Sequence, residues 1–216
     1  VNLTVNVSSN ECVVTNWDAS DKHPEAITIR SSRIDALQTA GVDVVVDRRG
    51  DGGLAAVRVA GGGIPSFDVT IEADASSAVY PAALAAGVPG SRIEIDGLAL
   101  GGAQPDVAAI ESLQAFGATV EAGDGTIVVQ GGDRPRGCDL DCEGFPDAAV
   151  GLAALAALCE GATRLTGLAT LRVKECDRVA ALATELRRVG CRVEETDASL
   201  LIDPVDVRRS RPEVLI

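Results

Sequence analysis

The sequence of 216 residues predicts an α+β fold of repeated β-α-β-α-β-β modules, in which buried helices pack beneath mixed sheets. Strand-like and helix-like segments follow one another in the same order twice, which indicates a duplicated unit. Three pairs of landmarks are separated by 73, 70 and 71 residues: Asp74 and Asp147, Gly97 and Gly167, and Asp106 and Asp177. Aromatic residues make up only 2% of the chain, so its core must consist of small aliphatic side chains, which favours closely packed helices.

The first predicted module covers about residues 67–130. Its elements are a strand at 69–72, an apolar helix at 79–86, a strand at 92–95, a helix at 107–116 that stops at Gly117, and a hairpin of 119–121 with 126–129. Asp74 lies at the mouth of the first helix, and Asp106 begins the second. Pro81 is expected in the first helical turn, where its missing N–H is not needed.

The second predicted module covers about residues 138–203 and repeats this order. Its elements are a helix at 148–158 that Asp147 begins, a strand at 163–166, a helix at 179–189 that ends at Gly190, and a hairpin of 192–194 with 200–202. The helix at 179–189 carries an apolar stripe on one face. The helix at 148–158 is apolar nearly all round, so we expect it to be buried among the helices of its sister modules.

A partial module precedes these two. It consists of a helix at 32–40 that ends at Gly41 and a hairpin of 42–46 with 55–59. Residues 1–7 alternate like a strand and residues 16–22 read as a loop, but residues 1–25 fit no module. The sequence therefore predicts one domain at 1–62, with this partial module and the unassigned N-terminal segment, and a second domain at 63–216. The junction is expected near residues 61–66, which are rich in glycine.

The charge of the chain excludes some classes of partner. A formal net charge of −13 and a pI of about 4.4 argue against nucleic acid. No apolar run is long enough for a membrane span and no signal peptide is recognisable, so we expect a cytoplasmic protein with reduced cysteines and no metal site or cofactor. Lys22 and Lys174 are the only lysines, and this acidic, lysine-poor composition resembles that of proteins from salt-loving organisms. An ordinary acidic protein of a GC-rich genome is the alternative.

Charged side chains gather at the starts of both helices of the second module. Asp147 follows a proline before the apolar helix, and Lys174, Glu175 and Arg178 surround the start of the last helix. Cations and carboxylates at helix starts suit an anionic substrate and a proton to be moved. Taken singly, each residue has a plainer interpretation: Asp147 as a helix cap, Glu175 as a partner of the helix dipole, and the two cations as a solvated pair.

Four segments of this chain resemble the 5-enolpyruvylshikimate-3-phosphate synthase family. Residues 74–80 are similar to its Gly-Asp-Ala-Ser-Ser-Ala-Ser-Tyr segment, and residues 146–149 match its Pro-Asp-Ala-Ala. Residues 172–178 match Arg-Val-Lys-Glu-Thr-Asp-Arg, with Cys176 in place of the threonine, and residues 184–190 continue the match. The resemblance covers roughly residues 26–203, and its Lys-Glu-x-Asp-Arg motif is specific to the family.

The resemblance implies transfer of the enolpyruvyl group of phosphoenolpyruvate to the 5-hydroxyl of shikimate 3-phosphate. It assigns Asp147 as the carboxylate that holds and deprotonates this substrate, and Glu175 as the group that handles the proton near the phosphoenolpyruvate carbon. Lys174 resembles a residue that contacts shikimate 3-phosphate, and Arg178 one that binds the phosphoenolpyruvate anion. Thr170 stands where the family has a substrate-binding asparagine. The resemblance implies no cofactor.

Other parts of the family pattern are absent. Family members are about twice as long, and their N-terminal Lys-Ser and Arg segment, Ser-Ser-Gln segment, Asn-Asp-His-Arg stretch and last catalytic lysine have no counterpart here. The sequence therefore predicts a central fragment, inactive by itself, whose partners are the two substrates and the missing parts of the same enzyme. Two other interpretations stay open. One is a noncatalytic module completed by a second chain. The other is a relative such as a UDP-N-acetylglucosamine enolpyruvyl transferase or an RNA-end cyclase, although the Lys-Glu-x-Asp-Arg motif argues against the former and the acidic charge against the latter.

Overall fold

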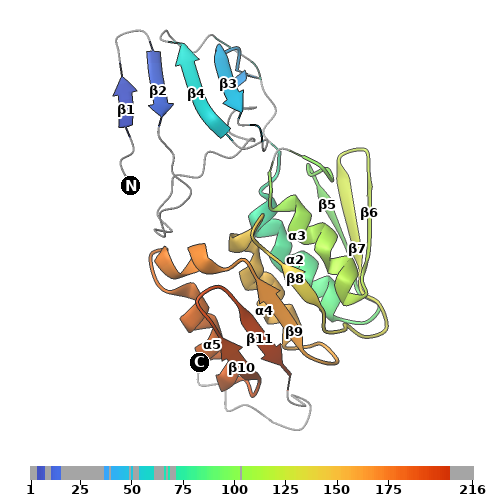
Figure 1. Cartoon of the computed structure of the whole chain (residues 1–216). Coiled ribbons are helices and arrows are strands. Elements are labelled where there is room, and N and C mark those ends of the chain that lie inside the picture. The colour runs from blue at the N-terminus through green and yellow to red at the C-terminus, as the bar shows by residue number, and fades with distance from the viewer. Residues whose placement is uncertain are drawn as a thin grey trace. The chain divides into compact units, whose positions relative to one another are not determined.

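The computed structural model describes residues 4–7, 11–15, 37–38, 40–48, 50, 54–60, 66, 68, 72–102 and 104–204 of the chain. The chain divides into two compact units, Val1–Ile71 and Glu72–Ile216, whose elements are labelled in Figure 1. None of the helices among the described residues is long and apolar enough to cross a membrane.

The first unit contains an antiparallel sheet. Its strands are β1 (Thr4–Val7), β2 (Glu11–Thr15), β3 (Val44–Arg48) and β4 (Leu54–Ala60), in the order β1-β2-β4-β3. The hairpin predicted at 42–46 and 55–59 is confirmed as β3 with β4, where Val44 and Val57 are buried. The strand predicted at 1–7 is confirmed over β1, whereas β2 was not predicted. Most of the helix predicted at 32–40, the loop at 16–22 and nearly all of the strand at 69–72 lie outside the described residues.

The first module of the second unit follows the predicted order. Its elements are α2 (Ala75–Gly87), β5 (Arg92–Asp96), α3 (Val107–Glu111), η1 (Ser112–Phe116), β6 (Thr119–Gly123) and β7 (Thr126–Gln130). Asp74 caps α2, so this helix begins four residues earlier than predicted. The expectation that Pro81 lies in the first turn was therefore wrong, because Pro81 is the seventh helical residue. Without an N–H, it leaves the carbonyl four residues earlier without a helical partner. The helix predicted at 107–116 is divided into α3 and η1, and it ends at Gly117 with a φ of 93°.

The second module completes the repeat. Its elements are β8 (Asp139–Asp141), η2 (Pro146–Ala148), α4 (Ala149–Ala156), β9 (Thr163–Thr166), η3 (Ala169–Val173), α5 (Arg178–Arg188), β10 (Arg192–Glu195) and β11 (Leu200–Asp203). The sheet order is β10-β11-β9-β8, with β8 parallel to β9 and the other pairs antiparallel. This sheet is mixed, as predicted. The helix predicted at 148–158 begins as the 3₁₀ turn η2 and ends at Ala156.

The two modules have the same topology and share one core. The order β5-β7-β6 in the first corresponds to β9-β11-β10 in the second. Helix α2 packs against α4 through small residues, since a Cβ on Gly151 would meet Val79 Cγ1 at 3.1 Å and one on Gly87 would meet Leu155 Cδ1 at 3.1 Å. Both helices are buried over most of their length, which confirms the expectation of apolar helices beneath the sheets.

Candidate active site

Two segments distant in sequence bring their charged residues together at the starts of helices in the second module. Asp147 lies in η2, and its carboxylate accepts hydrogen bonds from Lys174 Nζ and Arg178 Nη1, each at 3.1 Å. Lys174 lies in the connection between η3 and α5, and Arg178 is the first residue of α5. The helix-cap interpretation of Asp147 was wrong, since neither η2 nor α4 has a side-chain hydrogen bond at its described N-cap.

Glu175 joins this group through Arg178. The guanidinium of Arg178 donates from Nε and Nη2 to Glu175 Oε1, at 3.0 and 2.7 Å, while its Nη1 faces Asp147. We call the four residues Asp147, Lys174, Glu175 and Arg178 the ionic cluster. It contains two cations and two carboxylates, so its formal charges cancel. An anionic ligand that binds these cations therefore competes with the two carboxylates for them.

The ionisation of Glu175 depends on Arg178. The hydrogen bond from Arg178 is the main cause that lowers the pKa of the Glu175 carboxyl, and the same bond raises the pKa of the Arg178 guanidinium. Glu175 remains well exposed, with 68% of its side chain accessible, whereas Arg178 is 30% accessible. In this arrangement Glu175 is an ionised acceptor of the hydrogen bonds from Arg178 at neutral pH.

Thr170 lies apart from these contacts. It is an exposed residue of η3, and its side chain makes no hydrogen bond within the described structure.

The serines at the start of α2 behave as expected for capping: Asp74 accepts hydrogen bonds from the N–H groups of Ser76 and Ser77 and from the Ser77 hydroxyl at 2.6 Å. The Ser76 hydroxyl donates instead to Asp106, so both serine hydroxyls already have carboxylate partners within the protein.

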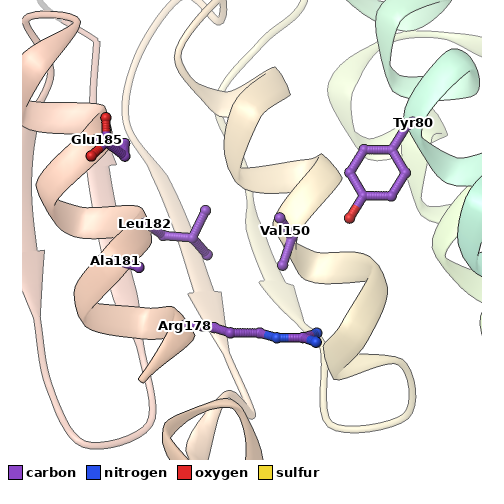
Figure 2. A pocket seen from close by; sticks show the side chains of 6 residues that line it. All are labelled: Tyr80, Val150, Arg178, Ala181, Leu182 and Glu185. Carbon is purple, nitrogen blue, oxygen red and sulfur yellow. The ribbon is translucent and has the colours of Figure 1, made fainter. Parts of the chain in front are cut away.

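A pocket adjoins the ionic cluster between α5, α4 and α2. Its lining consists of Tyr80, Val150, Arg178, Ala181, Leu182 and Glu185. Figure 2 shows the Arg178 side chain extending from the first turn of α5 toward α4, at one end of this pocket. Arg178 thus borders both the pocket and the carboxylates of the ionic cluster.

The five cysteines of the second unit, Cys138, Cys142, Cys159, Cys176 and Cys191, are free thiols. In the described part of the chain, no group of three or more His, Cys, Asp or Glu side chains is arranged to hold a metal ion. Burial raises the pKa of Cys142 and of Cys159 to about 12, so both remain protonated and serve as small core residues. Cys176, which replaces the family threonine inside the charged motif, is exposed.

Comparisons with known proteins agree with the fold and the motifs. The family model of EPSP synthase (3-phosphoshikimate 1-carboxyvinyltransferase) matches residues 22–214. The 3-phosphoshikimate 1-carboxyvinyltransferase of Cupriavidus necator is 45% identical over 142 residues, which are 63% of this chain and 32% of that protein. The one from Cellvibrio japonicus is 42% identical over 151 residues, 69% of this chain and 35% of the relative. The chain therefore spans about a third of the length of the curated relatives it matches.

Solved structures extend the similarity to nearly the whole chain. The EPSP synthase of Acinetobacter baumannii matches with a TM-score of 0.67 and 26% identity over 91% of this chain and 43% of its own. The enolpyruvyl transferase NikO from Streptomyces tendae matches with a TM-score of 0.57 at 21% identity, over 79% of this chain and 38% of its own, and shows the shared fold alone. The predicted fold class is thereby confirmed, and the family match over residues 22–214 shows that this chain belongs to the EPSP synthase family.

Proposed function

We propose that this chain is the central part of an enzyme of the shikimate pathway, which transfers the enolpyruvyl group of phosphoenolpyruvate to the 5-hydroxyl of shikimate 3-phosphate and releases phosphate. The observation that carries the proposal is the ionic cluster, in which two helix starts present two carboxylates beside two cations. This reaction needs a base for the hydroxyl, a proton carrier for the methylene carbon and cations for anionic substrates.

In the proposed mechanism, Asp147 accepts the proton of the 5-hydroxyl as that oxygen attacks the central carbon of phosphoenolpyruvate. Lys174, which donates to Asp147 in the free protein, turns to the phosphate of shikimate 3-phosphate. Arg178 binds the phosphoenolpyruvate anion with two N–H groups of its guanidinium. Thr170 contacts the bound substrate from η3.

Release of Arg178 from Glu175 supplies the proton carrier. Once Arg178 binds phosphoenolpyruvate, Glu175 loses the hydrogen bond that lowers its pKa, and the nearby substrate charges raise that pKa further. Glu175 then donates a proton to the methylene carbon during addition and takes one back when phosphate leaves. The acid form of Glu175 is thus produced by substrate binding and is not needed beforehand.

The remaining binding groups belong, in this proposal, to parts of the enzyme beyond this chain. Two cations that already neutralise two carboxylates are too few for two phosphates and a carboxylate. We place residues 1–62 with one domain of the whole enzyme and residues 63–216 with the other, the latter containing the modules at about 67–130 and 138–203. The chain alone is expected to be inactive, and phosphate release from both substrates by these 216 residues would contradict that expectation.

Calorimetric titration of shikimate 3-phosphate into the chain tests the substrate assignment. The parent protein is compared with an Asp147→Ala, Lys174→Ala double variant and with an Asp139→Ala, Arg164→Ala control. The control pair lies in the same module with its charges 3.8 Å apart on exposed side chains, and its removal changes the charge count equally. We expect heat from the parent and the control but none from the first variant.

Each other outcome has a definite meaning. Equal heat from all three proteins would locate the phosphate elsewhere on the surface. No heat from a demonstrably folded parent would contradict substrate binding by this part of the enzyme. A parallel titration with UDP-N-acetylglucosamine covers the related chemistry: heat from this ligand and none from shikimate 3-phosphate would assign the site to a nucleotide-sugar substrate.

We also propose that the protein works in the cytoplasm of a salt-loving organism. The net charge of −13 produces self-repulsion that high ionic strength screens, and free thiols suit a reducing compartment. Thermal melting in dilute buffer and in molar salt tests the adaptation, with a clear rise of Tm in salt as the expected result. A Tm that is unchanged or lowered by salt would favour an ordinary acidic protein.

A further inference from the structure

We propose that Arg172 is a positioning residue of this site, which closes the loop that carries Lys174 and Glu175 and so sets where these side chains meet Asp147. The consequence of this positioning for catalysis rests on the proposed function. Its structural part stands on contacts around the loop that involve none of the four residues of the ionic cluster.

Each nitrogen of the Arg172 guanidinium donates to an acceptor of its own. Its Nη1 donates to Asp177 Oδ2 at 2.7 Å, its Nη2 to the carbonyl oxygen of Thr196 at 2.5 Å, and its Nε to the carbonyl oxygen of Asp197 at 3.1 Å. Only 22% of this side chain is accessible, the lowest value among the cations in the ion pairs of the described residues. Each nitrogen of the planar fork has a defined partner, which fixes the direction of the side chain.

These contacts join both ends of the loop that carries the site. Arg172 precedes residues 173–176 and Asp177 follows them, so their ion pair closes a short ring around Lys174 and Glu175. The second oxygen of Asp177 accepts the N–H of Ala180 at 2.9 Å and caps α5. The N–H of Ala180 and then Arg172 lower the pKa of the Asp177 carboxyl, which keeps it ionised for both partners. The start of α5, where Arg178 lies, is therefore anchored to Arg172 through one carboxylate.

The other two acceptors belong to a turn between β10 and β11 that is closed by its own hydrogen bonds. The N–H of Thr196 donates to the carbonyl oxygen of Ser199 at 3.0 Å, and the two hydroxyls lie 2.7 Å apart. The N–H of Leu168, just before η3, donates to the carbonyl oxygen of Ala198 at 3.0 Å. Arg172 thus holds the loop of residues 173–176 against the β10–β11 turn. The same turn is hydrogen-bonded to Leu168, just before η3, the element that the loop follows.

The first module shows that the fold itself does not need this arginine. There, the N–H of Leu98 donates to the carbonyl oxygen of Gly125 in the β6–β7 turn at 3.1 Å, which corresponds to the contact of Leu168. The position that corresponds to Arg172, 70 residues earlier, is Gly102. The same turn-to-loop contact forms without a guanidinium. Arg172 is an addition to the one module whose helix starts carry the ionic cluster, and this association assigns it to the site.

Arg172→Lys separates positioning from charge, because lysine keeps the charge but its single ammonium cannot reach an aspartate and two carbonyls together. The readout is the pKa of the Glu175 carboxyl, measured by carbon-13 NMR titration, since Arg172 makes no hydrogen bond to Glu175. We expect this pKa to rise toward its ordinary range in Arg172→Lys and at least as far in Arg172→Ala, as the loop no longer holds Glu175 against Arg178. Arg164→Lys in the same module should leave it unchanged.

If Arg172 acted only on overall stability or only through its charge, the pKa of Glu175 in Arg172→Lys would stay at the parental value. If Arg172→Lys lowers Tm but leaves the Glu175 pKa at the parental value, the proposal is overturned. Titration of shikimate 3-phosphate into the same variants adds the functional arm, with binding expected to weaken by about tenfold in Arg172→Lys. If the parent itself does not bind this ligand, the proposed function fails, while the Glu175 pKa still decides whether Arg172 positions the loop.

Discussion

The two modules of the second unit use the same topology but treat their helix starts differently. In the first, Asp74 caps α2 and Asp106 accepts a hydrogen bond from the Ser76 hydroxyl. In the second, Asp177 caps α5, but Asp147 caps nothing and faces Lys174 and Arg178. Four aspartates at corresponding places thus have different partners.

This difference separates what the fold requires from what it does not. A helix start needs an acceptor for its free N–H groups, and one Asp or Ser satisfies that need. In the first module, Asp74 meets this need at α2, and the Asp106 carboxylate accepts from the Ser76 hydroxyl. The second adds two cations and a second carboxylate that pair with Asp147 or with one another, and this pairing contributes little stability because all are partly exposed. A function is the better explanation for these charges.

The largest expected effect compares Gly167→Ala with Gly97→Ala. Both glycines have left-handed φ values, 76° and 78°, so both substitutions carry about 1 kcal/mol of backbone strain. A Cβ on Gly167 would meet the backbone nitrogen of Glu143 at 2.3 Å, whereas the nearest atom to one on Gly97 is Ala73 Cβ at 3.5 Å. We expect Gly167→Ala to lose about 3 kcal/mol or more of unfolding free energy in urea, and Gly97→Ala about 1. Equal losses would mean that the second module relaxes its backbone freely.

The next prediction compares Asp106→Ala with Asp147→Ala, first in unfolding free energy and then in ligand binding. Asp106 is only 9% exposed and accepts from Ser76, so Asp106→Ala should cost about 2 kcal/mol of unfolding free energy. Asp147 is 41% exposed on its side chain, so Asp147→Ala should cost less than about 1 kcal/mol. Titration with shikimate 3-phosphate should show the reverse order, with binding lost only in Asp147→Ala. A large stability loss in Asp147→Ala would show that the ionic cluster also supports the fold.

The dependence of stability on acidic pH tests the two capping carboxylates, Asp74 at α2 and Asp177 at α5. The pKa of Asp74 is lowered mainly by the Ser77 hydroxyl, and that of Asp177 mainly by the N–H of Ala180. A carboxyl whose folded pKa is depressed stabilises the protein fully above its unfolded pKa of about 4, and this contribution is lost as the pH falls through the folded value. Tm should therefore decline below about pH 4, and Asp74→Asn and Asp177→Asn should each flatten that decline. If Tm falls with decreasing pH as steeply in both variants as in the parent, groups other than Asp74 and Asp177 cause the loss of stability in acid.

Much of this fold could be predicted from the sequence, because its signals are local. Alternating residues and glycine turns predict β5, β6, β7 and the strands β9 to β11, and a one-sided apolar stripe predicts α5. The strand β8 could not be predicted in this way. It has three residues, two of them aspartates, and it exists only through parallel pairing with β9, 25 residues later for the pair Asp139 and Arg164. The start of α2 was misplaced because Pro81 resembles a first-turn proline although Asp74 provides the cap.

The candidate site was predictable to a similar extent. Sequence pattern and family resemblance indicated the four members of the ionic cluster, but not which carboxylate pairs with which cation. The pairing of Asp147 with two cations depends on how η2 lies against η3 and α5. The role of Arg172 has no sequence signal beyond its place in the motif, since two of its acceptors are carbonyl oxygens of a turn 24 and 25 residues away.

The smallest expected effect compares the two ends of α5, which carry the same Glu–Arg pair at a spacing of three residues. Glu185 accepts from Arg188 Nη1 at 2.6 Å near the helix end, as Glu175 accepts from Arg178 near its start. The side chains of Glu185 and Arg188 are 63% and 71% exposed, so Arg188→Ala should change the unfolding free energy by no more than about 0.5 kcal/mol. It should also leave shikimate 3-phosphate and phosphoenolpyruvate titrations as in the parent, whereas Arg178→Ala should abolish the phosphoenolpyruvate signal. If both variants weaken binding equally, the effect is one of general charge, and the difference between the two ends of α5 would carry no functional meaning.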